Sequence, residues 1–290
     1  MELQKESKIA DCVITLGKFD GVHLGHQFLL GRAKQIARQK QLKFYVFTFD
    51  TNQSGAMIGR EEKQALLMAA GADGVYFAAL NDAFKAMSAR QFFYDILLKK
   101  FHARYVVAGA DWRFGHNREG DVHLLAALAK ESGIGVEIVD KIKVAGEIVS
   151  STNIRGYIAQ GEMEKANQML GRAYTIASTV LHGKMLGRTL GFPTINFQFE
   201  KGMLLPKRGV YITKTGGHPS MTNIGINPTV EQGSAVKAET HILDFDKDLY
   251  GQVVQVAFLR KIREEIQFSN LSDLTMQLQA DCAAVRKYFQ

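Results

Sequence analysis

The first 140 residues of the chain alternate short apolar runs with longer amphipathic stretches. Five runs have the length of buried strands and cover residues 12–16, 44–49, 75–80, 104–110 and 135–140. The stretches between them have apolar residues at helical spacing, at about 24–40, 61–70, 88–101 and 119–132. This alternation predicts a parallel sheet with helices on both faces, and ligands of such sheets bind at the carboxyl ends of the strands.

The pattern changes after about residue 172. All four prolines (Pro193, Pro206, Pro219 and Pro228) lie in this part of the chain. Short β-rich runs with close turn signals predict an antiparallel barrel or sandwich, and they cover residues 173–181, 209–215, 220–226, 238–245 and 252–259. Residues 269–289 carry an apolar helical stripe after a serine start signal, which predicts a C-terminal helix packed on the barrel.

These patterns divide the chain into three parts. We expect an α/β domain with a Rossmann-like parallel sheet over residues 1–155 and a helical connection over 156–172. An antiparallel β-barrel domain with the C-terminal helix should follow over 173–290.

Composition narrows the class of protein. The chain has 290 residues, of which 46% are hydrophobic, and no apolar run approaches the length of a membrane span. A polar N-terminus without a signal-peptide core, and two distant cysteines (Cys12 and Cys282), predict a reduced, cytoplasmic protein. The net charge of +7 suits an anionic partner, and the scattered basic residues favour small anions over nucleic acid.

The stretch GKFDGVHLGH (17–26) joins the first predicted strand to a helix expected to begin near Leu24. His23 and His26 are three residues apart, so both can face one ligand at the helix N-terminus, where backbone N–H groups favour phosphate. Gly21 and Gly25 would let a polyphosphate approach the backbone. The imidazoles can stabilise charge on an α-phosphate under attack. A metal pair or two structural histidines are the alternatives.

TLGKFDGVHLGH (15–26) resembles the signature of the nucleotidyltransferase superfamily, in the form found in bacterial FAD synthetases. AGADWRFGHNREGD (108–121) and VSSTNIR (149–155) resemble two further segments of that family. The resemblance implies catalytic roles for His23, His26 and Arg155. Taken alone, SSTNIR is equally well explained as a helix start with Arg155 in solvent. The ATP-binding residues that the resemblance implies are Gly17, Phe19, Asp20, Gly21, His23, Gly25, His26, Asp111, Ser150, Ser151, Thr152 and Arg155.

GKMLGRTLGFPTINF (183–197) resembles the principal motif of riboflavin kinases. Later segments (204–214, 222–230, 238–251 and 263–268) also match that family in order. The ATP-binding residues implied here are Gly183, Lys184, Gly191, Pro193, Thr194 and Asn196.

The same resemblance assigns chemistry to the barrel. Thr194 and Asn196 share a side if the segment is extended, and their neutral oxygens suit Mg²⁺. Glu239 is implied to contact the flavin and to accept the proton of the ribityl 5′-hydroxyl. Without the resemblance, Glu239 would be interpreted as an exposed strand carboxylate.

The segment TFDTNQSGAM (48–57) departs from the family, which has T-F-x-P-H-P near the flavin of the first domain. The proline and the histidine are both absent. We expect a more mobile loop and altered flavin affinity, with Phe49 and Asp50 as the flavin-binding residues.

The sequence therefore predicts a bifunctional enzyme of FAD biosynthesis. The barrel would phosphorylate riboflavin to FMN, and the N-terminal domain would adenylylate FMN to FAD with release of pyrophosphate. ATP, riboflavin and FMN are the expected partners of a monomer or weak homo-oligomer, with no nucleic acid or membrane. The alternatives are a monofunctional FAD synthetase, a kinase with weak adenylylation, and a non-enzymatic flavin-sensing or nucleic-acid-binding regulator. An aminoacyl-tRNA synthetase also uses H-x-G-H, but the chain has no K-M-S-K-S-like loop.

Overall fold

The computed structural model describes residues 11–50, 55–182, 186–199, 202–225 and 237–290. The chain divides into two compact units. The first unit comprises Met1–Asn52 and Ile58–Ser150, and the second comprises Gln53–Met57 and Ser151–Gln290. Each unit is described by itself.

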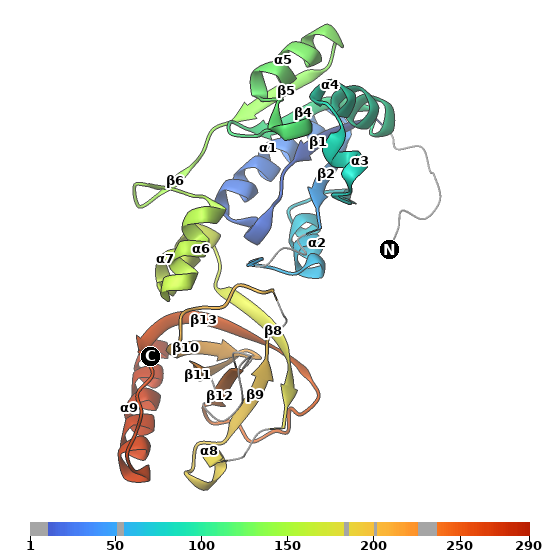
Figure 1. Cartoon of the computed structure of the whole chain (residues 1–290). Coiled ribbons are helices and arrows are strands. Elements are labelled where there is room, and N and C mark those ends of the chain that lie inside the picture. Colours follow the sequence, from blue (N-terminus) through green and yellow to red (C-terminus); the bar gives the residue numbers. More distant parts are fainter. Residues whose placement is uncertain (1–10, 51–54, 183–185, 200–201, 226–236) are drawn as a thin grey trace. The chain divides into compact units, whose positions relative to one another are not determined.

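A five-stranded parallel sheet is the centre of the first unit (Figure 1). Its strand order is β3-β2-β1-β4-β5, which confirms the predicted α/β class. From β1 the chain adds β2 and β3 on one side of the sheet, and it then adds β4 and β5 on the other side of β1. The direction in which strands are added therefore reverses between β1 and β4. Ligands of open α/β sheets bind at the carboxyl ends of the strands beside such a point. The strands are β1 (Cys12–Leu16), β2 (Lys43–Phe49), β3 (Gly74–Ala78), β4 (Ala103–Gly109) and β5 (Gly135–Val139).

Helices connect these strands, as the amphipathic stretches predict. The helix Asp82–Ala86 was not predicted, because five residues are too few to show a helical period. The helical elements are η1 (Asp20–Val22), α1 (Leu24–Lys40), α2 (Arg60–Ala69), α3 (Asp82–Ala86), α4 (Ala89–Gln91), the π-helix η2 (Phe92–Lys100), η3 (His116–Arg118) and α5 (Val122–Glu131). A hairpin of β6 (Lys143–Val144) and β7 (Glu147–Ile148) follows β5.

The second unit is a closed antiparallel barrel with two helices before it and one after it (Figure 1). The barrel order is β10-β11-β12-β9-β8-β13, which settles the predicted choice between barrel and sandwich. Its strands are β8 (Tyr174–Leu181), β9 (Thr194–Gln198), β10 (Gly209–Thr215), β11 (His218–Gly225), β12 (Lys237–Ile242) and β13 (Val253–Arg263). Its helices are α6 (Ser151–Gln160), α7 (Met163–Leu170), α8 (Leu186–Thr189) and α9 (Leu271–Phe289).

Alternation along the barrel strands separates two environments. On one side, the buried hydroxyls of Thr213, Ser220, Thr222 and Thr240 bond one another at 2.6–2.8 Å. On the other side, apolar residues including Met221 pack with Val285 of α9. The outer face of the barrel is therefore the face that α9 covers.

The start of α9 corrects one expectation. The capping residue is Asn270, whose side-chain oxygen accepts the N–H of Asp273 at 2.9 Å, and not a serine. Asparagine and serine are comparable caps, so the sequence alone did not separate them.

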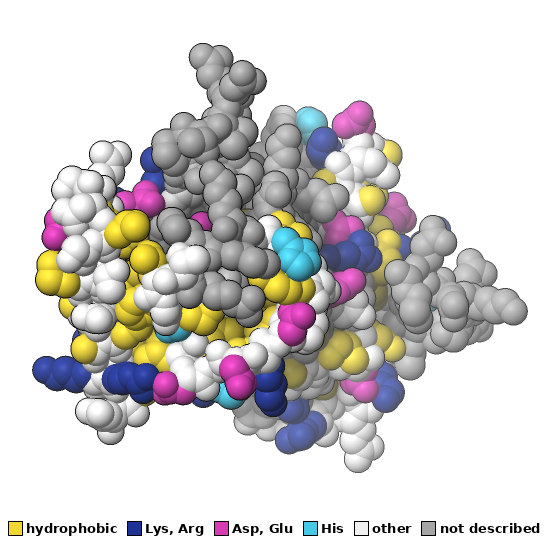
Figure 2. Space-filling view, turned by 90° about the horizontal axis from the view of Figure 1, so that it is seen from below, with side chains coloured by type: hydrophobic (Ala, Val, Ile, Leu, Met, Phe, Trp, Pro, Cys, Tyr) yellow, Lys and Arg dark blue, Asp and Glu magenta, His cyan; other side chains and the backbone are white. Residues whose placement is uncertain are grey.

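The surface carries charges of both signs. On the face in Figure 2, Lys and Arg side chains stand among Asp and Glu, around a band of hydrophobic side chains. Within the described ranges, no helix combines the length and the apolar character needed to cross a membrane.

Candidate active sites

The loop between β1 and α1 brings His23 and His26 together. The helix begins at Leu24, and His23 caps it by accepting the His26 N–H at its Nδ1, 3.3 Å away. The two imidazole rings stack with centroids 3.6 Å apart and planes 16° from parallel. The edge of Phe19 contacts His26, with ring centroids 5.1 Å apart.

This loop has an unusual backbone. Phe19, Gly21 and Val22 have φ angles of 48°, 76° and 38°, in the left-handed region. A β-branched residue such as Val22 is rarely found there, and such strain clusters at functional sites. A Cβ added at Gly25 would lie 3.2 Å from the His23 ring, so this glycine makes room for the histidine.

Electrostatics keep His26 neutral. Burial lowers its pKa well below the usual 6.5, and the nearby His23 and Lys63 lower this pKa further. The Nδ1 atom of His26 is buried and has no hydrogen-bond partner among the described residues. At neutral pH His26 is therefore an uncharged imidazole.

The other predicted ATP-binding residues fall into two groups. Asp111 follows β4 in the first unit, is exposed and pairs with Lys141 at 2.8 Å. Since β4 is hydrogen-bonded to β1, Asp111 and the histidines follow adjacent strands, at the carboxyl edge of the same sheet. Ser150 ends the first unit, whereas Ser151, Thr152 and Arg155 lie in α6 of the second. The VSSTNIR segment thus spans the boundary between the units.

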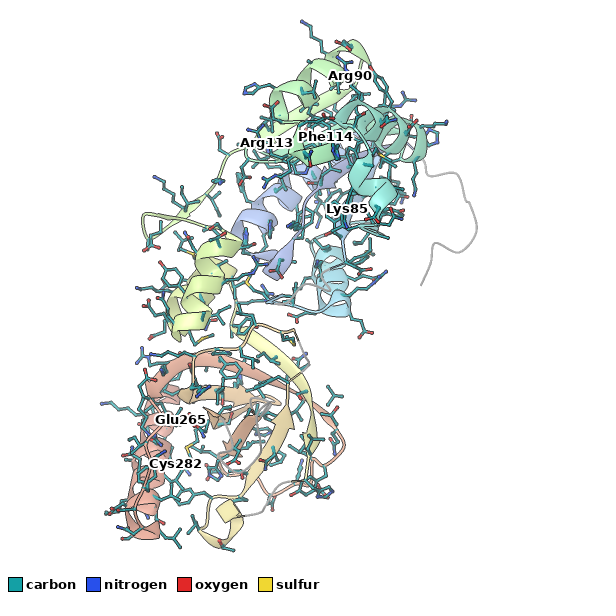
Figure 3. The ribbon with its side chains drawn as sticks, viewed as in Figure 1. Lys85, Arg90, Arg113, Phe114, Glu265 and Cys282 are labelled. Carbon is teal, nitrogen blue, oxygen red and sulfur yellow. The ribbon has the colours of Figure 1, made fainter. Side chains whose placement is uncertain are left out.

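Phe49, one of the two predicted flavin residues, belongs to a cluster of aromatic rings in the first unit. Phe49 contacts the ring of Phe84 at a centroid distance of 5.7 Å, and Asp50 forms an ion pair with Arg60. Trp112 and Phe114 stack at 4.4 Å, and Figure 3 labels Phe114 in this unit. Of the 48–57 loop, for which greater mobility was predicted, residues 51–54 lie outside the described ranges.

The sequence analysis missed Lys63 of α2. This side chain is fully buried, and its Nζ donates to the carbonyls of Lys18 and Phe49 at 3.1 Å each. It was missed because a lysine in the charged start of an amphipathic helix normally faces solvent.

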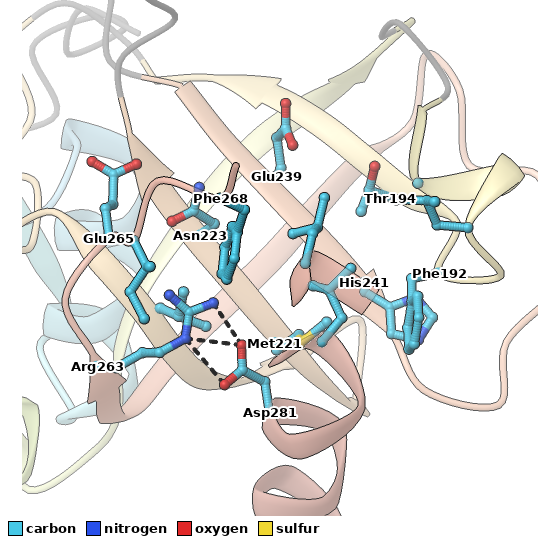
Figure 4. Close-up of a pocket in the computed structure, with 16 residues that line it drawn as sticks. Phe192, Thr194, Met221, Asn223, Glu239, His241, Arg263, Glu265, Phe268 and Asp281 are labelled. Carbon is cyan, nitrogen blue, oxygen red and sulfur yellow. Dashed lines mark hydrogen bonds and ion pairs between the residues drawn. The ribbon is translucent and has the colours of Figure 1, made fainter. Parts of the chain in front are cut away.

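A cavity of about 240 Å³ lies on the outer face of the barrel beside α9 (Figure 4). Strand register places polar residues in a row beside it: Asn196 opposes Glu239, and Glu239 opposes Asn223. Thr194 in the same way opposes His241. Since directly opposed residues share a face, the structure brings Thr194, Asn196 and Glu239 to one side of the sheet. Thr194 and Glu239 line the cavity.

The turn before β9 shapes one end of the cavity. Nδ1 of His241 donates to the Pro193 carbonyl at 2.8 Å, and Gly191 has a φ of 82°. A Cβ at Gly187 would lie 2.3 Å from the Phe192 carbonyl oxygen, so only glycine allows this turn. The predicted residues Gly183 and Lys184 lie outside the described ranges.

Two further polar groups of the cavity were not predicted. Asn223 has a buried Oδ1 without a hydrogen-bond partner among the described residues. A Cβ at Gly225 would lie 2.1 Å from an oxygen of Glu265, so this glycine makes room for the carboxylate. Figure 4 shows Glu265 and Asn223 at one end of the cavity.

A buried ion pair ties α9 to the barrel. Arg263 at the end of β13 contacts Asp281 of α9 through Nη2 at 2.7 Å and Nε at 3.1 Å (Figure 4). Gln277 donates to the same carboxylate at 2.9 Å. Asp281 is 1% exposed, so its charge is compensated inside the protein. This pair was not predicted, because its members lie 18 residues apart in different elements.

Two family models match the chain. The model described as FAD synthetase matches residues 5–153, and the model described as riboflavin kinase matches residues 170–289.

Curated relatives match over nearly the full length. The bifunctional riboflavin kinase/FMN adenylyltransferase of Listeria monocytogenes is 39% identical over 96% of this chain and 92% of its own. The enzyme of the same description from Escherichia coli is 35% identical over 96% of this chain and 93% of its own.

A crystal structure described as a macrolide-efflux protein from Streptococcus pneumoniae has the same fold. It is 30% identical, covers 96% of this chain and 94% of its own, and superposes with a TM-score of 0.88. The description 'macrolide-efflux protein' applies to the Streptococcus pneumoniae protein alone. The family models and the curated relatives agree with the two-unit architecture and with the motifs on each unit. The family predicted from those motifs is confirmed: the chain belongs to the bifunctional riboflavin kinase/FMN adenylyltransferase family.

Proposed function

We propose that the chain makes FAD from riboflavin in two steps on two sites. In the barrel unit, riboflavin and ATP give FMN and ADP. In the first unit, FMN and a second ATP give FAD and pyrophosphate. The observation that carries this proposal is that a separate family model matches each part of the chain, over residues 5–153 and 170–289, and that each unit has its own cluster of polar side chains.

In the barrel, Glu239 is the proposed base. The ribityl 5′-oxygen attacks the γ-phosphorus, its proton passes to Glu239, and the bond from the γ-phosphorus to the bridging oxygen breaks to release ADP. Glu239 is exposed on β12 beside the cavity, so a substrate hydroxyl has access to it. The cavity wall of Leu274, Leu278 and Phe268 offers apolar surface to a flavin ring.

The residues proposed to hold Mg²⁺ suit that ion. Thr194 and Asn196 offer a hydroxyl oxygen and an amide oxygen two residues apart on β9. Gly187 leaves space near the Thr194 hydroxyl, since a Cβ there would lie 3.3 Å from it. When bound, Mg²⁺ supplies positive charge to the phosphates.

In the first unit, the proposed chemistry is displacement at the α-phosphorus of ATP. An oxygen of the FMN phosphate attacks, and the bond to the leaving pyrophosphate breaks. His23 accepts at Nδ1, so a neutral His23 carries its proton at Nε2 and can donate it to a phosphate oxygen. Asp111 and the VSSTNIR residues Ser150, Ser151, Thr152 and Arg155 complete the proposed ATP contacts.

The direct test is a chromatographic assay of the purified chain with ATP and Mg²⁺, run with riboflavin and separately with FMN. Riboflavin should give FMN and then FAD. Conversion of FMN alone would leave a monofunctional FAD synthetase, and accumulation of FMN alone would leave a kinase.

We also propose that the partners are small molecules and that neither nucleic acid nor a membrane takes part. The chain is proposed to act in the cytoplasm as a monomer or weak homo-oligomer. A gel-shift assay with RNA and DNA and light scattering in solution test the partner and the assembly.

A further inference from the structure

Lys63 occupies an unusual position for a lysine. Its side chain is 0% exposed, and its ammonium donates two hydrogen bonds, both to main-chain carbonyls. Burial of a charged amine is costly unless the fold compensates it. A lysine retained in such a place points to a role for its charge.

The two carbonyls lie in two segments of the candidate site, the loop between β1 and α1 (residues 17–23, the histidine loop) and the last residue of β2. The Lys18 carbonyl directly precedes the left-handed Phe19, and the Phe49 carbonyl ends β2, one residue before Asp50. Thr48 also donates to the Lys18 carbonyl, at 3.1 Å. One buried side chain thus joins the histidine loop to the segment that precedes the predicted flavin contacts.

The hydrogen bonds to the Lys18 carbonyl also determine where the next backbone N–H points. In a trans peptide the C=O and the following N–H point in opposite directions. Because Lys63 and Thr48 hold the Lys18 carbonyl on the interior side, the Phe19 N–H points to the opposite side. Lys63 therefore sets the direction of a backbone donor in the strained loop.

The charge of Lys63 also reaches the catalytic pair. It is one of the three causes that lower the pKa of His26, after burial and His23. Burial lowers the pKa of Lys63, whereas the carboxylates of Asp20, in the histidine loop, and Asp50, after β2, raise it. These groups link one buried cation to both segments and to His26.

We propose that Lys63 is a positioning residue for adenylyl transfer: its ammonium fixes the peptide after Lys18 and joins the histidine loop to the end of β2. This inference rests on the proposed function of the first unit. Lys63 touches neither substrate in this proposal and acts through the histidine loop.

The structure predicts a pH dependence. Burial lowers the pKa of Lys63 from 10.5 to about 8, against the opposing effect of Asp20 and Asp50. Below this value the amine is charged, and above it the charge is lost. Conversion of FMN to FAD should therefore fall as the pH rises through about 8.

The experiment compares K63M and K63R with the control K130M, which changes an exposed lysine in the last turn of α5. The kcat for FMN to FAD and the kinase rate are measured across the pH range, together with thermal unfolding. K63M should lower the adenylylation kcat by about 100-fold at neutral pH and leave the kinase rate unchanged. K63R should keep more of the rate and lose the decline near pH 8, because arginine stays charged.

Several results would overturn the proposal. The proposal is wrong if the adenylylation kcat of K63M lies within about twofold of that of K130M. It is also wrong if K63M shows the same alkaline decline as the unmodified chain. If K63M does not fold, K63R decides: loss of the alkaline decline supports the proposal, and a decline identical to that of the unmodified chain refutes it. Failure of both the unmodified chain and K130M to make FAD would instead refute the proposed function.

Discussion

The two units compensate a buried charge in different ways. In the first, the ammonium of Lys63 is held by two main-chain carbonyls, one in the loop after β1 and one at the end of β2. In the second, the carboxylate of Asp281 is held by the guanidinium of Arg263 and the amide of Gln277. The first arrangement fixes backbone direction in a strained loop, and the second fastens a helix to a barrel.

The two candidate sites are also built on different kinds of backbone, loops in the first unit and paired strands in the second. The first is built on loops at the carboxyl edge of a parallel sheet, with φ angles of 48° and 38° at Phe19 and Val22. The second is built on paired antiparallel strands, where register alone places Asn196, Glu239 and Asn223 in a row. Substitutions that act on one site and not on the other therefore test the comparison.

The largest expected effect is that of E239Q. Removing the proposed base should lower the riboflavin kinase kcat by about 1,000-fold and leave conversion of FMN to FAD unchanged. Both rates are measured by chromatography on the same preparation. A variant that loses both activities in parallel would contradict the assignment of Glu239 to the barrel reaction alone.

D281N should release α9 from the barrel. Leaving Arg263 without its carboxylate costs about 3 kcal/mol, because one buried charge loses its partner. Hydrogen exchange of Leu271–Phe289 should then be about 100-fold faster, measured by mass spectrometry.

The matched control is D244N, which breaks the exposed pair of Asp244 with Arg286. Exposed ion pairs contribute about 1 kcal/mol or less, so α9 should remain protected in this variant. Equal exchange in the two variants would show that the buried pair does not hold the helix.

H26A tests the loop-built site. Loss of the neutral imidazole should lower the adenylylation kcat by about 100-fold and spare the kinase. The measurement is the same pair of chromatographic assays. Equal loss of both activities would argue against two separate sites.

The smallest expected effect is that of N270A. Removing the cap of α9 should cost about 1 kcal/mol, seen as faster exchange in the first turn of the helix. S269A changes the preceding exposed residue and should have no measurable effect. Faster exchange in S269A with unchanged exchange in N270A would show instead that the serine caps α9.

Most of the fold could be predicted from the sequence, because buried strands and amphipathic helices have distinct periods. The five strands of the sheet and the helix at Leu24–Lys40 lie where the apolar pattern predicts them. Strand β9 (Thr194–Gln198) was not among the predicted strands, because glycine and proline precede it in the motif. Such residues usually mark a turn.

The sites were harder to predict. The motifs indicated the residues that resemble a family signature, such as His26 and Glu239. They gave no indication of Lys63 or of the Arg263–Asp281 pair, because the significance of a buried charge depends on what the fold places around it. No short sequence pattern indicates which residues the fold will place around a given side chain.

The cap that His23 provides for α1 affects how an alanine scan of this loop is interpreted. The imidazole accepts a helix N–H at Nδ1, so H23A removes a cap worth about 1 kcal/mol together with any catalytic group. H23N keeps a capping side chain and separates the two contributions. The same bond fixes the tautomer, so nitrogen NMR of the labelled chain should find the proton of His23 on Nε2 before any nucleotide is added.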